Sequence, residues 1–198
     1  METFDNMNNS ERIRRFQIKS EIESQCMGSI EERIDRYLEI EHQGIIGGHY
    51  FAPASSECVY LYRDSYFIAT VMMSHAINEG IIKFIAERNS VERQKTNGDE
   101  KTIEELIDEL QKAGHISPNC ANASKGIWRS YRNDIHHMNP TVAKIPFQKL
   151  AQRNIKHLST IEKEIFGHDI INGAISPHQP KYWDINPNGT INTFLRLE

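Results

Sequence analysis

The segment from Asp64 to about Arg88 constrains the fold more than any other part of the chain, because it is long and apolar on a wide face. A helix with apolar residues on most of its sides is buried among several neighbours. We therefore predict a central helix, capped by Asp64 or Ser65, with other helices packed around it. Its apolar side chains are Phe67, Ile68, Val71, Met72, Ile77, Ile81, Ile82, Phe84 and Ile85.

A first helical region is predicted before this central helix, over residues 10–41, from the helical spacing of its apolar residues. Ser10 can cap its start, and Gly28 is expected to divide it into two helices. Residues 49–63, which include Pro53 and two adjacent serines, read as a loop. The central helix is thus expected to follow a helical region and a loop.

Three further helices are predicted after the central one. Residues 89–101 are almost wholly polar and are expected to form an exposed connection. Thr102 and Glu105 then match a capping box that starts a short helix. The last two helices are expected over residues 118–139 and 146–166, where proline and glycine mark the ends.

The C-terminal tail differs in character from the helical part. Two β-prone runs, residues 181–185 and 190–197, flank the turn sequence Asn186-Pro-Asn-Gly, a pattern typical of a β-hairpin. We predict an all-α fold: a helical bundle over residues 1–170. The tail, residues 171–198, is expected to carry a small β-hairpin that covers one end of the bundle.

Composition narrows the class of protein. The chain has 198 residues, enough for one domain whose core needs no disulfide or metal. Its three cysteines are scattered, its start lacks the basic and apolar parts of a signal peptide, and no apolar run approaches the ~20 residues that span a bilayer. We expect a soluble cytoplasmic protein that does not bind membranes. The net charge of −4 argues against a protein that coats nucleic acid.

One stretch, residues 128–140, carries the residue types of an active site: two arginines, an asparagine, an aspartate and two adjacent histidines. Residues three, four and seven apart share a helix face, so Arg129, Arg132 and His136 are expected to lie together, with Asn133 nearby. His137 lies further round, at the predicted helix end, where its side chain is able to turn either way.

These side chains suit the cleavage of a phosphodiester without a metal. A neutral histidine takes a proton from a ribose 2′-hydroxyl, and a protonated histidine gives one to the leaving oxygen. Arginine matches phosphate oxygens with its planar fork and stabilises the charge that develops on them. No metal or other cofactor is required by this chemistry.

The sequence Arg132-Asn-Asp-Ile-His-His137 resembles the Arg-x(4–6)-His motif of the HEPN superfamily, including the polar residue after the arginine. The resemblance implies a bundle of four or five helices and, for many members, a metal-independent endoribonuclease of toxin–antitoxin or antiviral-defence systems. It also implies a homodimer whose two motifs form one composite site on RNA. A tyrosine that often follows the histidine by two residues is replaced here by Asn139, which argues against regulation through that tyrosine.

On this resemblance, Arg132 stabilises the phosphorane, His137 or His136 is the acid/base, and Asn133 supports the geometry. Arg129 and Tyr131 are candidate substrate-binding residues, and an antitoxin or other regulatory protein is a possible partner. Two alternatives stay open: a HEPN-like domain that binds RNA or a protein without catalysis, and an unrelated helical interaction protein. The simpler interpretations are a solvated helix end for the histidines, an arginine partner for Asp134, and a buried core position for His75.

Overall fold

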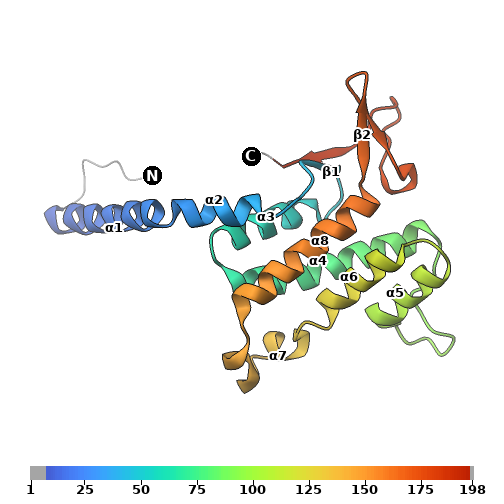
Figure 1. Ribbon diagram of the computed structural model, residues 1–198, viewed down its shortest axis with the longest axis horizontal. Helices are drawn as coiled ribbons and strands as arrows, with labels where there is room; N and C mark the ends of the chain where they lie inside the picture. Colours follow the sequence, from blue (N-terminus) through green and yellow to red (C-terminus); the bar gives the residue numbers. More distant parts are fainter. Residues whose placement is uncertain (1–7, 197–198) are drawn as a thin grey trace.

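The computed structural model describes residues 8–196, which form a mostly helical protein with two small antiparallel sheets (Figure 1). The α-helices are α1 (Asn9–Gly28), α2 (Ile30–Leu38), α3 (Ala52–Arg63), α4 (Phe67–Arg88), α5 (Ile103–Lys112), α6 (Pro118–Trp128), α7 (Arg132–His136) and α8 (Phe147–Ile165). The strands are β1 (Ile45–Gly47), β2 (His168–Ile171), β3 (Ala174–Pro177) and β4 (Thr193–Leu195). A helical bundle with small β elements is therefore confirmed.

Helix α4 is the centre of the bundle, as its wide apolar face predicts. It packs against α3, α5, α6 and α8, and α7 contacts it near its middle, at His75 and Glu79 (Figure 1). The predicted cap is wrong, because Tyr66 occupies the N-cap position without a side-chain hydrogen bond. Asp64 pairs instead with the guanidinium of Arg63, and Ser65 turns the chain with a φ of 68°.

The segment predicted as a loop before α4 is mostly helix α3. Pro53 lies in its first turn, where the missing backbone N–H has no intrahelical partner to lose. The two serines, which favour loops when exposed, are buried here. Ser55 donates a hydrogen bond to the buried carboxylate of Glu162 on α8, and this contact explains a polar residue inside the helix.

The single helix predicted over residues 118–139 is in fact two helices. Helix α6 ends at Trp128, and Tyr131 then adopts a left-handed backbone conformation with a φ of 57°. Helix α7 follows as a separate turn and a half, and a 3₁₀ turn, η2 (Pro140–Lys144), leads on to α8. The break lies inside the proposed motif stretch, between Arg129 and Arg132.

Other predicted boundaries fare better. The capping box of α5 is present: Thr102 accepts from the Glu105 backbone, and Glu105 accepts from the Thr102 backbone. The first helical region is divided at Gly28 as expected. Its cap is Asn8 rather than Ser10, because Asn8 forms a capping box with Glu11.

The β-hairpin is not where the turn sequence of the tail placed it. Residues around Asn186 form only one isolated bridge, Ile185 with Ile191. The hairpin is β2–β3, joined by Asn172 and Gly173, whose φ values of 52° and 79° are those of a type I′ turn. The boundary drawn after residue 170 thus falls inside β2.

The end of the described chain is fastened to the bundle by β4, which pairs with β1, and by Arg196. The Arg196 guanidinium donates to both carboxylate oxygens of Glu162, at 2.8 and 2.9 Å, and to Ser55 at 2.6 Å. The side chains of this ion pair are 2% and 3% exposed, so the pair is buried. No helix among residues 8–196 combines the length and apolar character needed to cross a membrane.

Candidate active site

Helix α7 holds the motif residues on a short, strained turn at one end of the bundle (Figure 1). Tyr131 directly precedes it with a φ of 57°, and Met138 follows shortly after it with a φ of 48°. Left-handed backbone in a residue other than glycine costs about 1–2 kcal/mol and persists only where the surroundings enforce it. Buried Ile127 and Ile135 anchor the chain on both sides of the first strained residue. The turn is therefore shaped by packing, and its exposed side chains are presented in a fixed place.

His136 lies against a buried histidine of the central helix. Its Nε2 is 3.4 Å from Nδ1 of His75, and the two rings are tilted by 36°. His75 is itself buried, while His136 is exposed. The interior of the bundle thus contacts one of the two motif histidines directly.

The hydrogen bonds behind His75 fix its tautomer. The hydroxyl of Ser130 donates to the carbonyl of Ile127 at 2.5 Å and accepts from the amide of Asn154 at 2.9 Å. Its remaining lone pair faces Nε2 of His75 at 2.8 Å, so Nε2 carries the proton and donates. Nδ1 of His75 is then an acceptor, and His136 donates to it from Nε2. This arrangement leaves Nδ1 of His136 as the ring atom available for proton transfer.

Burial keeps His75 uncharged. Desolvation, with smaller contributions from His136 and Arg132, lowers the pKa of His75 to about 4. A neutral ring at physiological pH is what the tautomer requires, because a doubly protonated His75 has no acceptor for His136. His75 was expected to be a satisfied core histidine, and it is buried and hydrogen-bonded, but it also supports the motif.

Arg132, one helical turn before His136, is held in a definite orientation. Its guanidinium carbon lies 4.3 Å from the centre of the Trp128 ring, and its Nη2 donates to Glu79 of α4 at 3.2 Å. Its Nε is buried and has no hydrogen-bond partner among the described residues. Stacking and ion pairing together fix the plane of the guanidinium, and its exposed side is left for a ligand.

A shallow hollow of about 320 Å³ lies beside Arg132, lined by Glu104, Trp128, Arg129, Tyr131, Arg132, Asn133 and Asp134. Arg129 forms an ion pair with Glu104 across it. Tyr131 is about half exposed, in agreement with a surface role rather than a core one. These residues form a polar surface that continues from the arginine toward α5.

The structure does not bring every predicted residue to the same place. His137 is the C-cap of α7 and is exposed, with no described contact of its ring. Arg129 is the C-cap of α6 whereas Arg132 begins α7, so the predicted common face with His136 is wrong for Arg129. Among the described residues Asp134 pairs with no arginine; it accepts hydrogen bonds from Thr141 and Asn139, which lower the pKa of its carboxyl.

Comparison with protein-family models, with curated proteins and with solved structures found no match to this chain. The candidate site is therefore supported by its own geometry and by the motif resemblance.

Three members of the site were missed by the sequence: His75, Ser130 and Asn154. Helix α4 carried a signal, because Thr70, Ser74 and Asn78 recur every fourth residue in an otherwise apolar helix. All three are buried, and Ser74 and Asn78 bond to α8 and α6 respectively. Regularly spaced polar residues on a buried helix indicate a polar network in the core.

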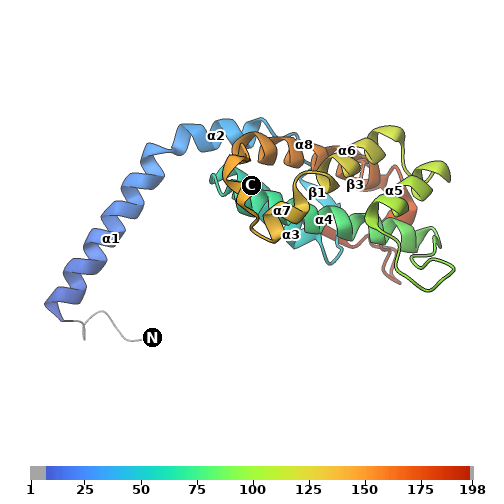
Figure 2. The same cartoon turned by 90° about the horizontal axis from the view of Figure 1, so that it is seen from below.

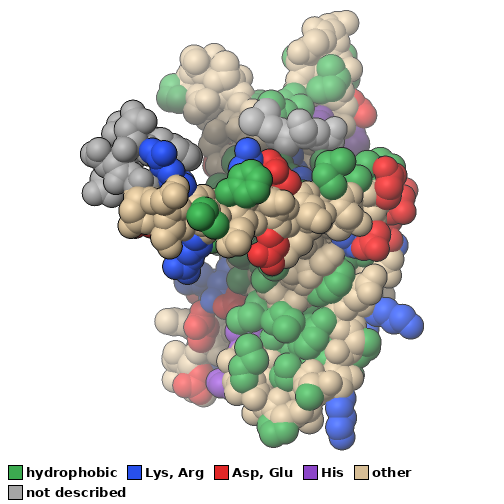
Figure 3. Space-filling model, turned by 90° about the vertical axis from the view of Figure 1, so that its left-hand side faces the viewer, with side chains coloured by type: hydrophobic (Ala, Val, Ile, Leu, Met, Phe, Trp, Pro, Cys, Tyr) green, Lys and Arg blue, Asp and Glu red, His purple; other side chains and the backbone are tan. Residues whose placement is uncertain are grey.

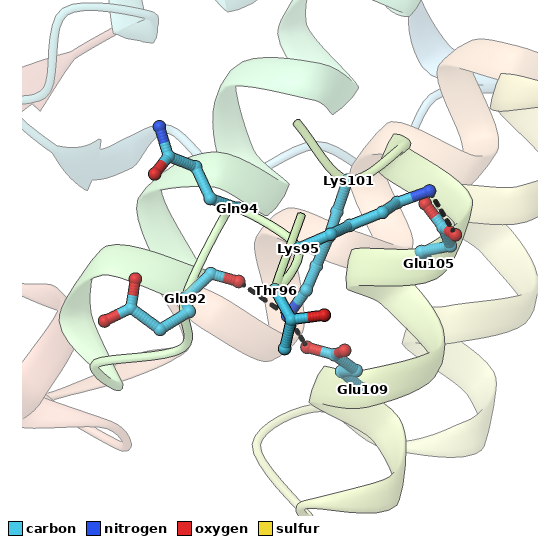
Figure 4. Close-up of a pocket in the computed structure, with 7 residues that line it drawn as sticks. All are labelled: Glu92, Gln94, Lys95, Thr96, Lys101, Glu105 and Glu109. Carbon is cyan, nitrogen blue, oxygen red and sulfur yellow. Dashed lines mark hydrogen bonds and ion pairs between the residues drawn. The ribbon is translucent and has the colours of Figure 1, made fainter. Parts of the chain in front are cut away.

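A larger hollow, about 630 Å³, lies elsewhere, between α5 and the connection that precedes it (Figure 4). Its charged side chains neutralise one another: Lys95 pairs with Glu105, and Lys101 pairs with Glu109 and the carbonyl of Glu92. These pairs hold the connection against α5. Within residues 8–196, no three His, Cys, Asp or Glu side chains are placed to hold a metal ion.

Proposed function

We propose that the protein is a metal-independent endoribonuclease of the HEPN type, acting through Arg132 and the two histidines of α7. One observation carries the proposal: exposed His136 is hydrogen-bonded to buried His75, one turn from an arginine whose plane is fixed by stacking. A surface imidazole that is oriented from the interior is the arrangement of a general base or acid.

In this mechanism Nδ1 of His136 takes the proton of a ribose 2′-hydroxyl, and the 2′-oxygen attacks the adjacent phosphorus. The bond to the 5′-oxygen breaks, and that oxygen takes a proton from a second imidazole, for which we assign His137 of the same chain or of a second copy. Arg132 stabilises the charge on the phosphoryl oxygens. The products carry a 2′,3′-cyclic phosphate and a 5′-hydroxyl.

The other predicted residues keep supporting roles. Asn133 is exposed beside Arg132 and supports the position of the phosphate, and Arg129 and Tyr131 contact the RNA chain beyond it. We further propose a cytoplasmic homodimer that serves as a toxin or antiviral-defence effector, under the control of an antitoxin or another regulatory protein. This setting rests on the motif resemblance.

A second candidate function has its own observation. Both arginines of the site are paired with carboxylates, Arg132 with Glu79 and Arg129 with Glu104, which weakens the local positive field that attracts phosphate. A HEPN-like module that binds RNA or a partner protein without catalysis agrees with this pairing. Cleavage activity separates the two functions.

The test is incubation of the purified protein with a long mixed-sequence RNA in EDTA. Cleavage by the parent that is lost in His136→Ala and Arg132→Ala supports the enzyme. Exposed residues on other elements provide matched controls, His178→Ala for the histidine and Arg93→Ala for the arginine, and both should cut normally. No cleavage by the parent, with RNA binding retained, would instead establish the binding module.

A further inference from the structure

Helix α1 is an arm that leaves the body of the protein. Figure 2 shows it extending away from the bundle at an angle to α2. It has 20 residues and is thus about 30 Å long, yet none of them is buried in the part of the chain that the structure describes. Helices in water gain most of their stability from packing an apolar face, so an arm of this kind requires a partner surface.

The arm exposes large apolar side chains over its whole length. Phe16 is 73% exposed and Met27 is 70% exposed, and Ile13, Ile18 and Ile22 are about half exposed. Scattered single apolar residues are normal on a protein surface, but three that share one side of a projecting helix, Ile13, Phe16 and Met27, mark an interaction surface. Hydrophobic side chains also gather on the end of the body below the arm, which faces the viewer in Figure 3.

One side of the arm is apolar toward both ends of the helix and polar in the middle. Ile13, Phe16, Ser20 and Met27 follow each other at spacings of three, four and seven residues, which places them in one row along the helix. Ile13 and Met27 are equally far from Ser20 in the sequence. If a second arm packs antiparallel so that the two Ser20 residues face each other, Ile13 of each arm lies opposite Met27 of the other arm.

Charge along the arm has the same symmetry. Residues 9–19 hold four basic side chains and one acidic side chain, whereas residues 20–28 hold two acidic side chains and no basic one. The acidic character continues into α2, whose first turn carries Glu31 and Glu32. An antiparallel pair of arms brings the basic half of each against the acidic half of the other, and a parallel pair brings like charges together.

We propose that α1 is a homodimerisation arm, which packs antiparallel against α1 of a second copy of this chain about a two-fold axis near Ser20. Self-complementary surface of this kind is what a two-fold interface requires. Beyond Met27 the partner's arm ends opposite the start of α2, where Ile30 is exposed beside a hollow of about 390 Å³ shared with Tyr60 of α3. This inference does not depend on whether the protein cuts RNA.

Charge reversal tests the pairing in the full chain, with the mass in solution measured by sedimentation equilibrium at micromolar concentrations. The parent should be a dimer. Arg14→Glu/Lys19→Glu and Glu21→Lys/Glu23→Lys should each weaken the dimer tenfold or more, and the four changes in one chain should restore it. Lys112→Glu/Lys149→Glu, on exposed positions of α5 and α8, is the control and should remain dimeric.

Disulfide trapping tests the antiparallel direction. Cys58 and Cys120 are buried, and exposed Cys26 is removed by Cys26→Ser. In that background Ser20→Cys should give a cross-linked dimer on oxidation, and Ser10→Cys should not, because only position 20 meets itself on the axis. A parent that stays monomeric overturns the proposal and assigns the arm to a different partner. Equal cross-linking at positions 10 and 20 overturns the antiparallel pairing. Neither readout involves RNA, so failure here leaves the proposed cleavage activity untouched.

Discussion

The Nε2 atom of His75 lies 2.8 Å from the hydroxyl of Ser130, across the boundary between the central helix and the segment that leads into α7. This contact determines which nitrogen of His75 faces the surface as an acceptor. Through it, the buried amide of Asn154 on α8 and the exposed imidazole of His136 belong to one chain of hydrogen bonds. The catalytic proposal depends on that chain more than on the motif spacing.

Substitution of His75 should impair cleavage although His75 does not touch RNA. In His75→Leu, His136 loses the acceptor for its Nε2 proton, and we expect the cleavage rate to fall by about 10–100-fold, as for other residues that orient a functional histidine. His157→Leu, a partly buried histidine of α8, should leave the cleavage rate unchanged. A cleavage rate in His75→Leu equal to that of the parent would remove the positioning role.

Stability should fall in mild acid because of the same residue. The pKa of His75 is about 4 in the folded protein and about 6.5 when the chain is unfolded. Between these values the unfolded state binds the extra proton, so the free energy of unfolding decreases as pH falls from about 6.5 to about 4. The loss from His75 is on the order of 2–3 kcal/mol.

Urea denaturation at about pH 7, 6, 5 and 4, which covers that interval, provides the measurement. Burial also lowers the pKa of His49 and of His157, so these residues add to the slope with the same sign. His75→Asn should flatten the dependence of stability on pH. If the slope of His75→Asn equals that of the parent, His75 is not the group responsible.

Removal of one partner of the buried ion pair between Arg196 and Glu162 should strongly lower the free energy of unfolding. Arg196→Met leaves an unpaired carboxylate in the core and should lower the free energy of unfolding by about 3–5 kcal/mol. Arg196→Met/Glu162→Met removes both charges and should recover most of that loss. Thermal and denaturant unfolding of the parent, both single variants and the double variant give the coupling. Additive losses would show that the pair acts as two independent residues.

Backbone strain after α7 should be removable. Met138 is 61% exposed and has a φ of 48°, a conformation that asparagine adopts more readily than methionine. Met138→Asn should therefore raise the free energy of unfolding by about 0.5–1 kcal/mol. Met138→Ala removes the same apolar side chain but keeps the strain, so it should bring no gain. Equal stabilisation by both would assign the effect to the lost side chain instead.

The helices that are predicted correctly from the sequence are those whose pattern lies within the helix itself. The wide apolar face of α4 and the Thr102–Glu105 capping box of α5 need no distant partner to be recognised. Helix α3 was missed because its serines favour loops until Glu162, more than one hundred residues away, supplies a hydrogen bond. The hairpin was predicted at the wrong turn, because Asn172-Gly173 favours a type I′ turn more strongly than the segment around Asn186 does. The β-prone run after Asn186 pairs with β1 instead.

The sequence predicted where the candidate site lies along the chain but not which buried residues contact it. The motif gave Arg132 and the adjacent histidines, and it could not distinguish between His136 and His137. That distinction comes from His75, which is 61 residues away from His136 along the chain. No glycine or proline at Tyr131 indicates the helix break there. The break arises because Ile127 and Ile135, on either side of it, are buried in the core.

The ion pair that fastens β4 also has a consequence during protein synthesis. Arg196 follows Glu162 by 34 residues, so the ribosome releases α8 before the cation that its buried carboxylate requires. At a typical 5–20 residues per second, the nascent chain spends about 2–7 s with that carboxylate unpaired. In that interval the Glu162 carboxylate has the hydroxyl of Ser55 as a hydrogen-bond donor but lacks its cation, so β4 and Arg196 complete the core around α8 last.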